Sequence, residues 1–369
     1  MTTASSDVRY MRQALRLARQ GEGGTRPNPP VGAVVVQRGR VVGRGYHARA
    51  GTAHAEIHAL AAAGKRARGG TLYVTLEPCS TWGRTSPCTE AILAAGIRRV
   101  VACVVDPNPK HAGRGFVKLR RAGIAVTKGI CMEEGQELLA PFARWVTQGM
   151  PYVTLKLAMT LDGRIADRLG HSRWISSTSS RDVVQELRRR ADAVMVGAGT
   201  TLADDPALSC RAPRALPLLR VIVDSRGRTP PRAQVFRDGA GQQTIVATTD
   251  RCSRARQEAY RRSGAQIWIL PAKRMHVSLK ALLRRLGREG VLHVVCEGGG
   301  KLAAGMVHAR LINQLWLFVA PKTLGGSGIP VVGGAGWLLG KAPGFAFRSC
   351  TAVGPDMLLI AEPDEKREA

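Results

Sequence analysis

Two separated segments of this chain carry one histidine and two cysteines whose combination restricts the fold more than any other feature. The segments are "HAEIHAL" at residues 54–60 and "LEPCSTWGRTSPC" at residues 76–88. His54, Cys79 and Cys88 offer one imidazole and two thiolates, a ligand set that suits a catalytic zinc ion with a fourth position left for water. Each ligand lies where a strand or loop meets an expected helix start, and helix N-terminal amides favour thiolates there. The fold must therefore bring these helix starts to one point.

Glu56 lies two residues after His54, where a carboxylate can shuttle a proton from a zinc-activated water to a leaving amine. The order His-x-Glu, Pro-Cys and a second Cys is a signature of zinc deaminases that act on nucleobases. A zincin metalloprotease needs His-Glu-x-x-His, and Glu56 comes one place too late for that motif. We expect His58 on the packed side of its helix. A structural zinc, which needs a fourth ligand, and unmetallated core cysteines stay open as alternatives.

Length and composition limit the class of protein. A chain of 369 residues that is 44% hydrophobic can bury two cores, so we expect two domains. The sequence has neither a signal-peptide core nor a run of about 18 apolar residues, which predicts a cytoplasmic protein without a membrane partner. The eight cysteines are scattered over a long chain without secretory features, which favours free thiols or metal ligands over disulfides.

The formal net charge of +28 allows several partners, since a basic chain attracts nucleic acids, membranes and phosphorylated metabolites. Arginine outnumbers lysine and is spread along the chain, as in "ELRRRADA", "RCSRARQEAYRRSG" and "LLRRLGREG". No single basic tail or arm occurs. We interpret the charge chiefly as solvated helix faces; a nucleic-acid surface and help with a phosphorylated substrate are the alternatives.

The hydrophobic pattern predicts an α/β domain over residues 1–149. A first helix is expected with its N-cap near Ser6 or Asp7, and two strands are expected on either side of a turn at residues 38–40. Beyond them, strands at 71–76, 99–106 and 124–129 alternate with helices at 54–63, 88–96, 113–123 and 133–148. Gly149 and Pro151 interrupt the pattern, and we place the domain boundary there.

A second α/β alternation fills residues 150–369. The expected helices lie near residues 179–190, 251–263, 278–288 and 301–309. Apolar strands are expected at residues 152–159, 193–198, 219–225, 244–249, 266–270, 291–299 and 314–322. Each half of the chain should therefore build its own sheet covered by helices.

With these residues the chain resembles the zinc-dependent cytidine-deaminase-like superfamily. Most members separate the two cysteines by two residues, and this chain separates them by eight. The longer form "PCSTWGRTSPC", with "RPNPPVGAVVV", "GYH", "AHAE" and "DPNP", is similar to the deaminase half of the bifunctional riboflavin-biosynthesis deaminase/reductases. The motifs "LKLAMTLDGRIA", "SRWISS", "VGAGTTLADDPALSCR", "VIVDSRGRTP" and "EGGGKLAAG" follow the order of that family's reductase domain. The resemblance covers almost the whole chain.

The resemblance implies a dihydrofolate-reductase-like fold for the second domain, with NADPH as hydride donor. Matching positions would line the NADPH site at Ala158, Trp174, Thr200, Asp204, Ser225, Gly299, Gly300, Lys301, Leu302, Ala303, Ala304 and Gly305. The substrate would be held by Ser172, Arg188, Leu208, Arg211 and Glu297.

The residues of this half by themselves make a weaker case. The glycines of "EGGGKLAAG" would let the backbone approach a phosphate at a helix start, but an ordinary strand-to-helix turn fits them as well. The loop lacks the G-x-G-x-x-G spacing of a Rossmann site. Asp204 and Asp205 before Pro206 are expected in a turn or a helix cap rather than at a metal.

The family further implies two sequential reactions on one small molecule, 2,5-diamino-6-ribosylamino-4(3H)-pyrimidinone 5′-phosphate. Zinc-dependent deamination of the ring comes first, and NADPH then reduces the ribosyl group to ribityl. Two arginines would suit the substrate phosphate. We expect weaker substrate contacts from Asn28, His47 and Asn108; turn residues beside proline, and a surface residue at a strand end for His47, are the alternatives.

Three further expectations complete this interpretation. The partner is the phosphorylated pyrimidine rather than a nucleic acid, and the chain is expected to form a homo-oligomer. The family usually has a histidine after "PCS", whereas this chain has Thr81 and Trp82, which alters one loop contact to the substrate. The competing functions are a tRNA adenosine or nucleoside deaminase with an unrelated second domain, and a nucleic-acid-binding protein with a structural zinc.

Overall fold

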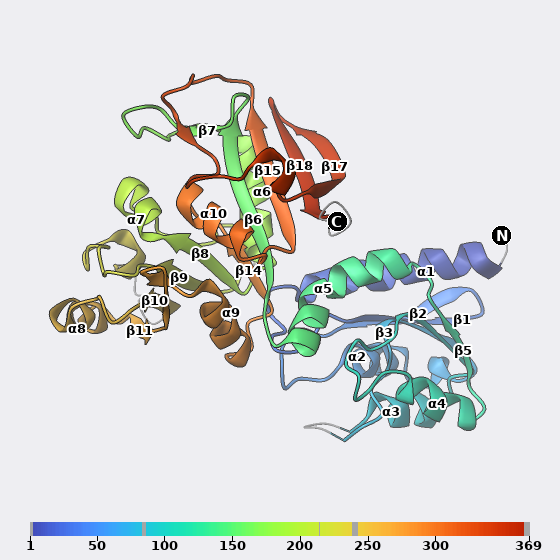
Figure 1. The fold of residues 1–369 in the computed structure, drawn as a ribbon. Helices are drawn as coiled ribbons and strands as arrows, with labels where there is room; N and C mark the ends of the chain where they lie inside the picture. The colour runs from blue at the N-terminus through green and yellow to red at the C-terminus, as the bar shows by residue number, and fades with distance from the viewer. Residues whose placement is uncertain (1–2, 83–85, 214, 238–242, 365–369) are drawn as a thin grey trace. The chain divides into compact units, whose positions relative to one another are not determined.

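The backbone divides at Gly149, which ends a long helix in the left-handed conformation with a φ of 66°. The structure, a computed structural model, describes residues 3–82, 86–213, 215–237 and 243–364. Contacts divide the chain into two units, Met1–Gly149 and Met150–Ala369. Each unit contains its own sheet with helices on both faces (Figure 1).

In the described part of the N-terminal unit, five strands form a mixed sheet in the order β2-β1-β3-β4-β5. Strand β1 pairs antiparallel with β2 and β3, while β3, β4 and β5 run parallel. Arg38 and Gly39 both have positive φ, as a two-residue hairpin turn between twisted strands requires. The predicted hairpin is therefore confirmed. The strands are β1 (Gly32–Gln37), β2 (Arg40–Tyr46), β3 (Thr71–Leu76), β4 (Arg99–Val104) and β5 (Ala125–Lys128).

Five helices cover the described part of this sheet because successive strand residues point to opposite faces. In β1, Val34 and Val36 pack with α1 and α5, whereas Ala33 and Val35 pack with the helices on the other face (Figure 1). The helices are α1 (Thr3–Ala18), α2 (Ala55–Ala63), α3 (Cys88–Ala94), α4 (Arg114–Arg121) and α5 (Met132–Gln148).

Helix α2 lies unusually close to β2 because two strand positions have no side chain. A Cβ on Gly43 would lie 2.1 Å from the Ala59 carbonyl oxygen, and one on Gly45 would lie 2.4 Å from that of Ala55. Such contacts are far inside van der Waals separation, so only glycine fits at both positions. The two glycines thereby set the position of the first turn of α2, which carries Glu56.

The first helix begins earlier than the sequence predicts. The N-cap was expected near Ser6 or Asp7, but α1 begins at Thr3 and Asp7 lies inside it. The buried Asp7 carboxylate accepts hydrogen bonds from both terminal nitrogens of Arg99, at 3.0 and 2.7 Å, and one from the Tyr73 hydroxyl at 2.7 Å. Asp7 therefore anchors α1 to strands β3 and β4 instead of capping a helix.

The C-terminal unit contains a larger sheet, with nine strands in its described residues in the order β11-β10-β9-β8-β14-β6-β15-β18-β17. The strands from β11 to β15 in that order are parallel, and β18 and β17 extend the sheet as an antiparallel hairpin. The strands are β6 (Tyr152–Thr160), β8 (Ala193–Gly197), β9 (Leu219–Val223), β10 (Thr244–Thr248), β11 (Gln266–Ile269), β14 (His293–Cys296), β15 (Gln314–Ala320), β17 (Phe345–Val353) and β18 (Asp356–Pro363).

Helices α9 and α10 pack on one face of this sheet, and α6 and α8 pack on the other. The first core contains Met195 of β8 with Leu282 of α9, and the second contains Val194 of β8 with Tyr260 of α8. The helices are α6 (Thr178–Arg189), α7 (Ala198–Asp204), α8 (Arg254–Arg262), α9 (Leu279–Arg288) and α10 (Gly300–His308). Two two-stranded ribbons flank the sheet, β7 (Arg164–Ala166) with β16 (Ile329–Pro330), and β12 (Ala272–Lys273) with β13 (His276–Val277).

The expected strands and helices of this half are confirmed, but α7 and the β17–β18 hairpin were not predicted. Helix α7 is a seven-residue segment directly after β8, too short for a hydrophobic period to show. Most side chains of β17 are exposed, so its sequence lacks the alternation of a half-buried strand. No helix within the described residues is long and apolar enough to span a bilayer.

Removing the Asp7 charge should destabilise the N-terminal unit. Asp7→Asn leaves Arg99 without its carboxylate, and we expect the free energy of unfolding to fall by about 2–4 kcal/mol. Calorimetry of the full chain measures this as a lower melting temperature for that unit. Arg12→Gln is the matched control: Arg12 lies on α1 like Asp7, and the variant removes its exposed 3.0 Å pair with Glu134 of α5, so it should lower the melting temperature much less. Equal effects of the two variants would contradict the anchoring role.

Candidate zinc and reductase sites

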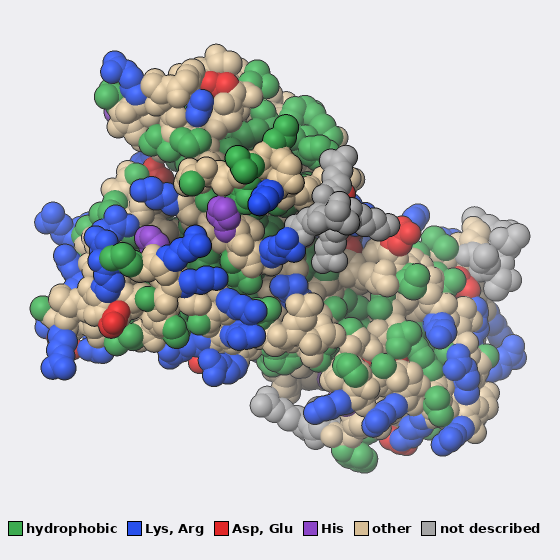
Figure 2. Space-filling view, in the orientation of Figure 1, with side chains coloured by type: hydrophobic (Ala, Val, Ile, Leu, Met, Phe, Trp, Pro, Cys, Tyr) green, Lys and Arg blue, Asp and Glu red, His purple; other side chains and the backbone are tan. Residues whose placement is uncertain are grey.

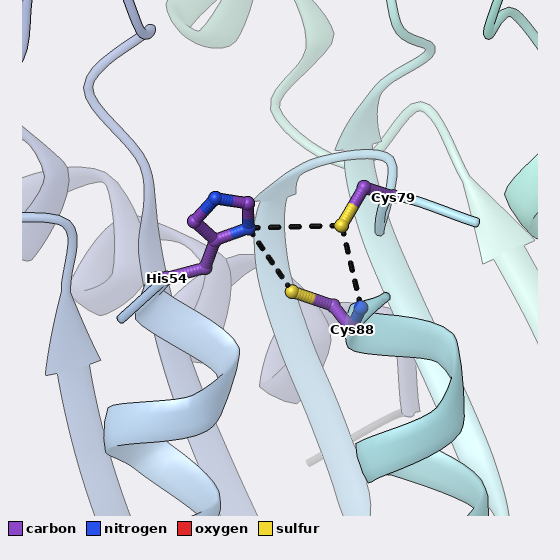
Figure 3. Close-up of side chains that lie close together, drawn as sticks. All are labelled: His54, Cys79 and Cys88. Atoms are coloured by element: carbon purple, nitrogen blue, oxygen red, sulfur yellow. Dashed lines mark hydrogen bonds between the residues drawn. The ribbon is translucent and has the colours of Figure 1, made fainter. Parts of the chain in front are cut away.

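Three metal-ligating side chains converge where two helices of the N-terminal unit begin. His54 is the N-cap of α2, Cys88 is the first residue of α3, and Cys79 lies in the segment after β3. The His54 Nδ1 atom lies 3.2 Å from the Cys88 sulfur and 3.6 Å from the Cys79 sulfur, and the Cys88 amide donates to the Cys79 sulfur at 3.3 Å (Figure 3). The three ligand atoms lie within 4.8 Å of one another.

This geometry fits a zinc ion. Zinc bonds of about 2.0 Å to nitrogen and 2.3 Å to sulfur, at tetrahedral angles, place the two ligand atoms about 3.5 Å apart. The two nitrogen-to-sulfur distances fall on either side of that value. Within the described residues this group contains three ligands and no fourth. A three-ligand set with an open position is typical of catalytic rather than structural zinc.

Only one of the two thiols ionises readily, because the thiol that stays protonated donates a hydrogen bond to the thiolate. A hydrogen bond from Cys88, followed by contacts with His54 and the Cys88 amide, lowers the pKa of Cys79 to about 4. The same thiol hydrogen bond, together with burial, raises the pKa of Cys88. The pocket by itself thus stabilises one thiolate, and a divalent cation among the ligands would stabilise both.

Glu56 is buried beside the three ligands, with 3% of its surface exposed. Burial, and secondarily the negative charge of Cys79, raises the pKa of Glu56 to about 7. Its own backbone amide and the Cys88 thiol donate hydrogen bonds that partly oppose this shift. A carboxyl group whose pKa lies near neutrality can both accept and return a proton, as a proton shuttle must.

His47 and Asn28 extend the site from the other side of His54. His47 follows β2 and is 2% exposed, so the alternative of a surface residue at a strand end is wrong. Its ring lies edge-on to that of His54, with centroids 5.3 Å apart. Burial lowers the pKa of His47, and a neutral ring that donates from Nδ1 to the Ala53 carbonyl must accept at Nε2 from the Asn28 amide, 3.1 Å away.

Asn108 lies in the loop that follows β4. Strands β3 and β4 are parallel neighbours, so this loop and the Cys79 segment leave the sheet at the same edge. The loop is organised by its own side chains. The backbone amide of Asn108 donates to the Asp106 carboxylate at 2.8 Å, and the backbone amide of Lys110 donates to the side-chain oxygen of Asn108 at 3.1 Å. Burial raises the pKa of Asp106, and the charges of Glu77 and Cys79 add to the shift.

The inserted loop between the cysteines is described only in part. Thr81 and Trp82 are exposed, the indole by 78%, and the "GRT" motif at residues 83–85 lies outside the described residues. His58 is exposed on α2, so the expectation that it faces the packed side is wrong. Its position follows from the glycine contacts, because the buried face of α2 is formed by Ala55, Ala59 and Ala63.

In the C-terminal unit the expected site residues gather along one edge of the sheet. Ala158 lies near the carboxyl end of β6, Thr200 and Asp204 in α7 after β8, Ser225 after β9, and Glu297 after β14. These four strands are parallel, so their carboxyl ends share an edge, where ligands of open α/β sheets bind.

Arg188 and Glu297 form a largely buried ion pair with two hydrogen bonds at this edge. Arg188 donates from Nε at 2.6 Å and from Nη2 at 3.0 Å to the two carboxylate oxygens, and from Nη1 to the Ser209 carbonyl at 2.8 Å. Burial opposes ionisation of Glu297, but the charge and hydrogen bonds of Arg188 outweigh it and lower the pKa of Glu297. The positive charge of Lys156 in β6 also lowers the pKa of Glu297. Burial lowers the pKa of Lys156 itself.

Further contacts join other expected residues in pairs. The Ser172 hydroxyl donates to Asp204 at 2.8 Å, and the Gly299 amide donates to Thr200 at 3.1 Å. Asp204 ends α7, so it belongs to a helix C-terminus. The expected residues 300–305 form the first turns of α10, with Gly299 as its N-cap.

The other expected residues make no hydrogen bond to another expected site residue within the described part of the chain. Ser225 accepts from the Val277 amide at 3.0 Å, and Leu208 is buried with a positive φ of 53°. The exposed Arg211 donates through its amide to the Gln185 side chain. Trp174 is 63% exposed, with the Arg181 guanidinium 4.4 Å from its ring centroid.

Comparisons with known proteins agree with both halves. The family model "Cytidine and deoxycytidylate deaminase zinc-binding region" matches residues 4–104, and "RibD C-terminal domain" matches residues 151–359. A curated relative, the riboflavin biosynthesis protein RibD of Escherichia coli, is 41% identical over 368 residues, covering 96% of this chain and 98% of the relative. The chain belongs to the RibD family.

Other RibD proteins support the same assignment. The Aquifex aeolicus protein is 44% identical over 320 residues, covering 86% of this chain and 88% of its own length. The solved structure of Acinetobacter baumannii RibD, form 1, superimposes with a TM-score of 0.88 at 34% identity, covering 98% of this chain and 100% of that one. The Thermotoga maritima diaminohydroxyphosphoribosylaminopyrimidine deaminase/5-amino-6-(5-phosphoribosylamino)uracil reductase also gives 0.88, at 35% identity, with the same coverage.

RibD membership confirms the predicted fold class and enzyme type. The chain has a cytidine-deaminase-like N-terminal domain and a dihydrofolate-reductase-like C-terminal domain, and it is a deaminase and reductase of riboflavin biosynthesis that uses zinc and NADPH. The alternative of an unrelated second domain is wrong, because the RibD C-terminal model matches that half.

Sequence reasoning missed three charged residues of these sites. Glu77 ends the apolar run "TLYVTL", Asp106 begins "DPNP", and Lys156 interrupts "YVTLKLAM". A charged residue within or directly after a buried strand is the signal that could have found Glu77 and Lys156, because burying a charge requires a partner.

Losing one thiolate should remove zinc without affecting the other half. Cys79→Ala leaves two ligands, and we expect bound zinc after dialysis against a chelator to fall below about a tenth of the wild-type content. Deaminase activity should be lost, while NADPH-dependent reduction by the C-terminal unit continues. Cys350→Ala, at an exposed cysteine in β17, is the control and should keep its zinc. Full zinc content in the Cys79 variant, measured by mass spectrometry, would contradict the ligand assignment.

Proposed function

We propose that the first reaction is hydrolytic deamination of 2,5-diamino-6-ribosylamino-4(3H)-pyrimidinone 5′-phosphate. The observation that carries this proposal is the three-ligand group of His54, Cys79 and Cys88 with the buried Glu56 beside it. When bound, zinc supplies the positive charge that makes a water acidic enough to act as a nucleophile near neutral pH. Glu56 accepts a proton from that water and delivers it to the amino group that leaves as ammonia.

Asn28, His47 and Asn108 position the pyrimidine in this proposal. Asn28 is held by the neutral His47 ring, which is fixed in turn by the Ala53 carbonyl, so the amide keeps one orientation. Asn108 approaches from the loop after β4. Thr81 and Trp82 stand in the loop where the family usually has a histidine, so the contacts made by this loop differ from those of relatives.

The second reaction transfers a hydride from NADPH to C1′ of the ribosyl group. The C1′–O4′ bond of the sugar ring opens, O4′ takes up a proton, and the product carries a ribityl chain. Residues of α7, the α10 start, Ala158, Trp174 and Ser225 line the cofactor in this assignment. Ser172, Leu208 and Glu297 face the substrate, and Arg188 keeps the Glu297 carboxylate ionised and oriented. Arg188 uses three of its five N–H donors on Glu297 and Ser209, so the exposed Arg211 is the better partner for the substrate phosphate.

The remaining proposals concern the binding partners, the cellular compartment and the oligomeric state. Lysines and arginines are spread over the visible face rather than collected in one patch (Figure 2), which supports solvated charge and a small-molecule substrate over nucleic acid. We assign the protein to the cytoplasm.

We also infer a homo-oligomer, since β17 is an exposed edge strand of the described sheet and Phe347 on it is 71% exposed. A monomer mass in sedimentation equilibrium would contradict the oligomer.

One assay tests both reactions. Purified protein is incubated with the pyrimidine phosphate, with and without NADPH, and ammonia and both pyrimidine products are followed. We expect ammonia in both incubations and the ribityl product only with NADPH. Absence of ammonia would overturn the deaminase assignment. NADPH left unoxidised after deamination is complete would overturn the reductase assignment.

Glu56→Gln should separate proton transfer from metal binding. The amide cannot accept the proton, so we expect kcat for deamination to fall by about 100- to 10,000-fold. Zinc content and reductase activity should stay at the wild-type level, because Glu56 is not a ligand. Glu90→Gln, an exposed acid on α3, is the matched control. Loss of zinc from the Glu56 variant would refute the proton-shuttle role.

A further inference from the structure

A buried carboxylate that takes no part in the chemistry above lies two residues before the ligand Cys79. Glu77 follows β3 and is 5% exposed. Four backbone amides from the other side of the site donate to it: Asp106 at 3.2 Å and Gly113 at 2.9 Å to Oε2, and Gly115 at 2.8 Å and Phe116 at 3.4 Å to Oε1. Such a carboxylate, buried and surrounded by donors, needs each of these bonds to offset its desolvation.

These bonds place Glu77 at the N-terminus of α4. Helix α4, which is described throughout, has no acidic residue in its own first turn, and its N-cap Gly113 is a left-handed residue with a φ of 77°. The amides of Gly115 and Phe116 are first-turn donors that a capping side chain ordinarily satisfies. Glu77 therefore caps α4 from a different segment of the chain, and its negative charge suits the helix dipole.

The same carboxylate fixes the loop that precedes α4. The amides of Asp106 and Gly113 mark the two ends of this loop, and both donate to Oε2 of Glu77. Within the loop, the Asp106 carboxylate accepts from the backbone amide of Asn108, and the Asn108 side chain accepts from the backbone amide of Lys110. A Cβ on Gly115 would lie 2.1 Å from the Pro78 carbonyl oxygen, so the start of α4 packs directly on the segment that leads to Cys79.

We propose that Glu77 is a positioning residue for deamination: its carboxylate holds the 106–113 loop, and with it Asn108, at a fixed place relative to Cys79. This inference rests on the proposed role of Asn108 as a substrate contact. One side chain thereby connects the zinc-ligand segment after β3 with the substrate loop after β4. A glutamine cannot replace it, because its amide nitrogen would turn hydrogen-bond donors toward backbone donors at two of the four contacts.

The test is a comparison of Glu77→Gln with the wild type in the deaminase assay at saturating zinc. We expect KM for the pyrimidine phosphate to rise by about 10- to 100-fold, since a displaced loop no longer presents Asn108, while kcat changes by less than about threefold. Zinc content and reductase activity should stay unchanged. A capping role without consequence for the substrate would leave KM at the wild-type value, and that result would overturn the proposal.

Two further variants separate positioning from loss of stability. Asp7→Asn breaks a buried carboxylate network of the same domain that does not contact the loop, and at a temperature below its melting point it should keep the wild-type KM. In an Asn108→Ala background, Glu77→Gln should change KM by less than about twofold, because the two residues act through one contact. Full additivity of the two substitutions would contradict the proposal.

Glu77→Asp provides the measurement if the glutamine variant does not fold. It keeps the carboxylate but sets it back by one methylene, so KM should rise above the wild-type value, but by less than the increase of about 10- to 100-fold expected for glutamine; an unchanged KM would again overturn the proposal. The wild-type assay keeps this test distinct from the proposed function. Without ammonia from the wild type the deaminase assignment itself fails, whereas an active wild type and equally active Glu77 variants refute the positioning role alone.

Discussion

The close packing of helix α2 against strand β2 is the constraint on which the deaminase site depends. Gly43 and Gly45 allow the helix backbone to approach the strand, and the alanines of α2 complete the contact. Since His54 precedes this helix and Glu56 lies in its first turn, their positions are set by the packing of α2 and not by the metal alone. A side chain at either glycine would displace the ligand and the proton shuttle together.

The sites of the two halves form at the same place in each sheet, but their buried carboxylates have different partners. In each unit, parallel strands end at one edge, and the residues that follow them form the site. In the N-terminal unit a buried carboxylate, Glu77, binds backbone amides and joins two such loops. In the C-terminal unit the buried carboxylate of Glu297 pairs with Arg188, which keeps it charged. Burial makes both carboxylates sensitive to the loss of their partners.

The sequence was sufficient to predict the order of the strands and helices other than α7 and the β17–β18 hairpin, because the hydrophobic period is a local signal. For the same reason, turn residues and ligand types predicted the hairpin at Arg38 and Gly39 and the convergence of His54, Cys79 and Cys88. Contacts between residues that lie far apart in the sequence could not be predicted from such local signals. Asp7 reads as a helix cap until Arg99 and Tyr73 are placed beside it. His58 was expected on the packed side of its helix and is exposed, since the rotation of α2 is decided by the glycines of the neighbouring strand β2.

The wide spacing of the two cysteines is compatible with the geometry of a zinc site, for a reason visible in the backbone. Cys79 is held by the segment after β3, where Glu77 binds the start of α4, and Cys88 is held by its own place at the start of α3. The Thr89 amide donates to the Cys79 carbonyl at 3.2 Å and the Cys88 amide to the Cys79 sulfur at 3.3 Å, so the two segments bind each other directly. Of the residues between the two cysteines, Thr81 and Trp82 are exposed, and the direct bonds between the Cys79 and Cys88 segments do not depend on them.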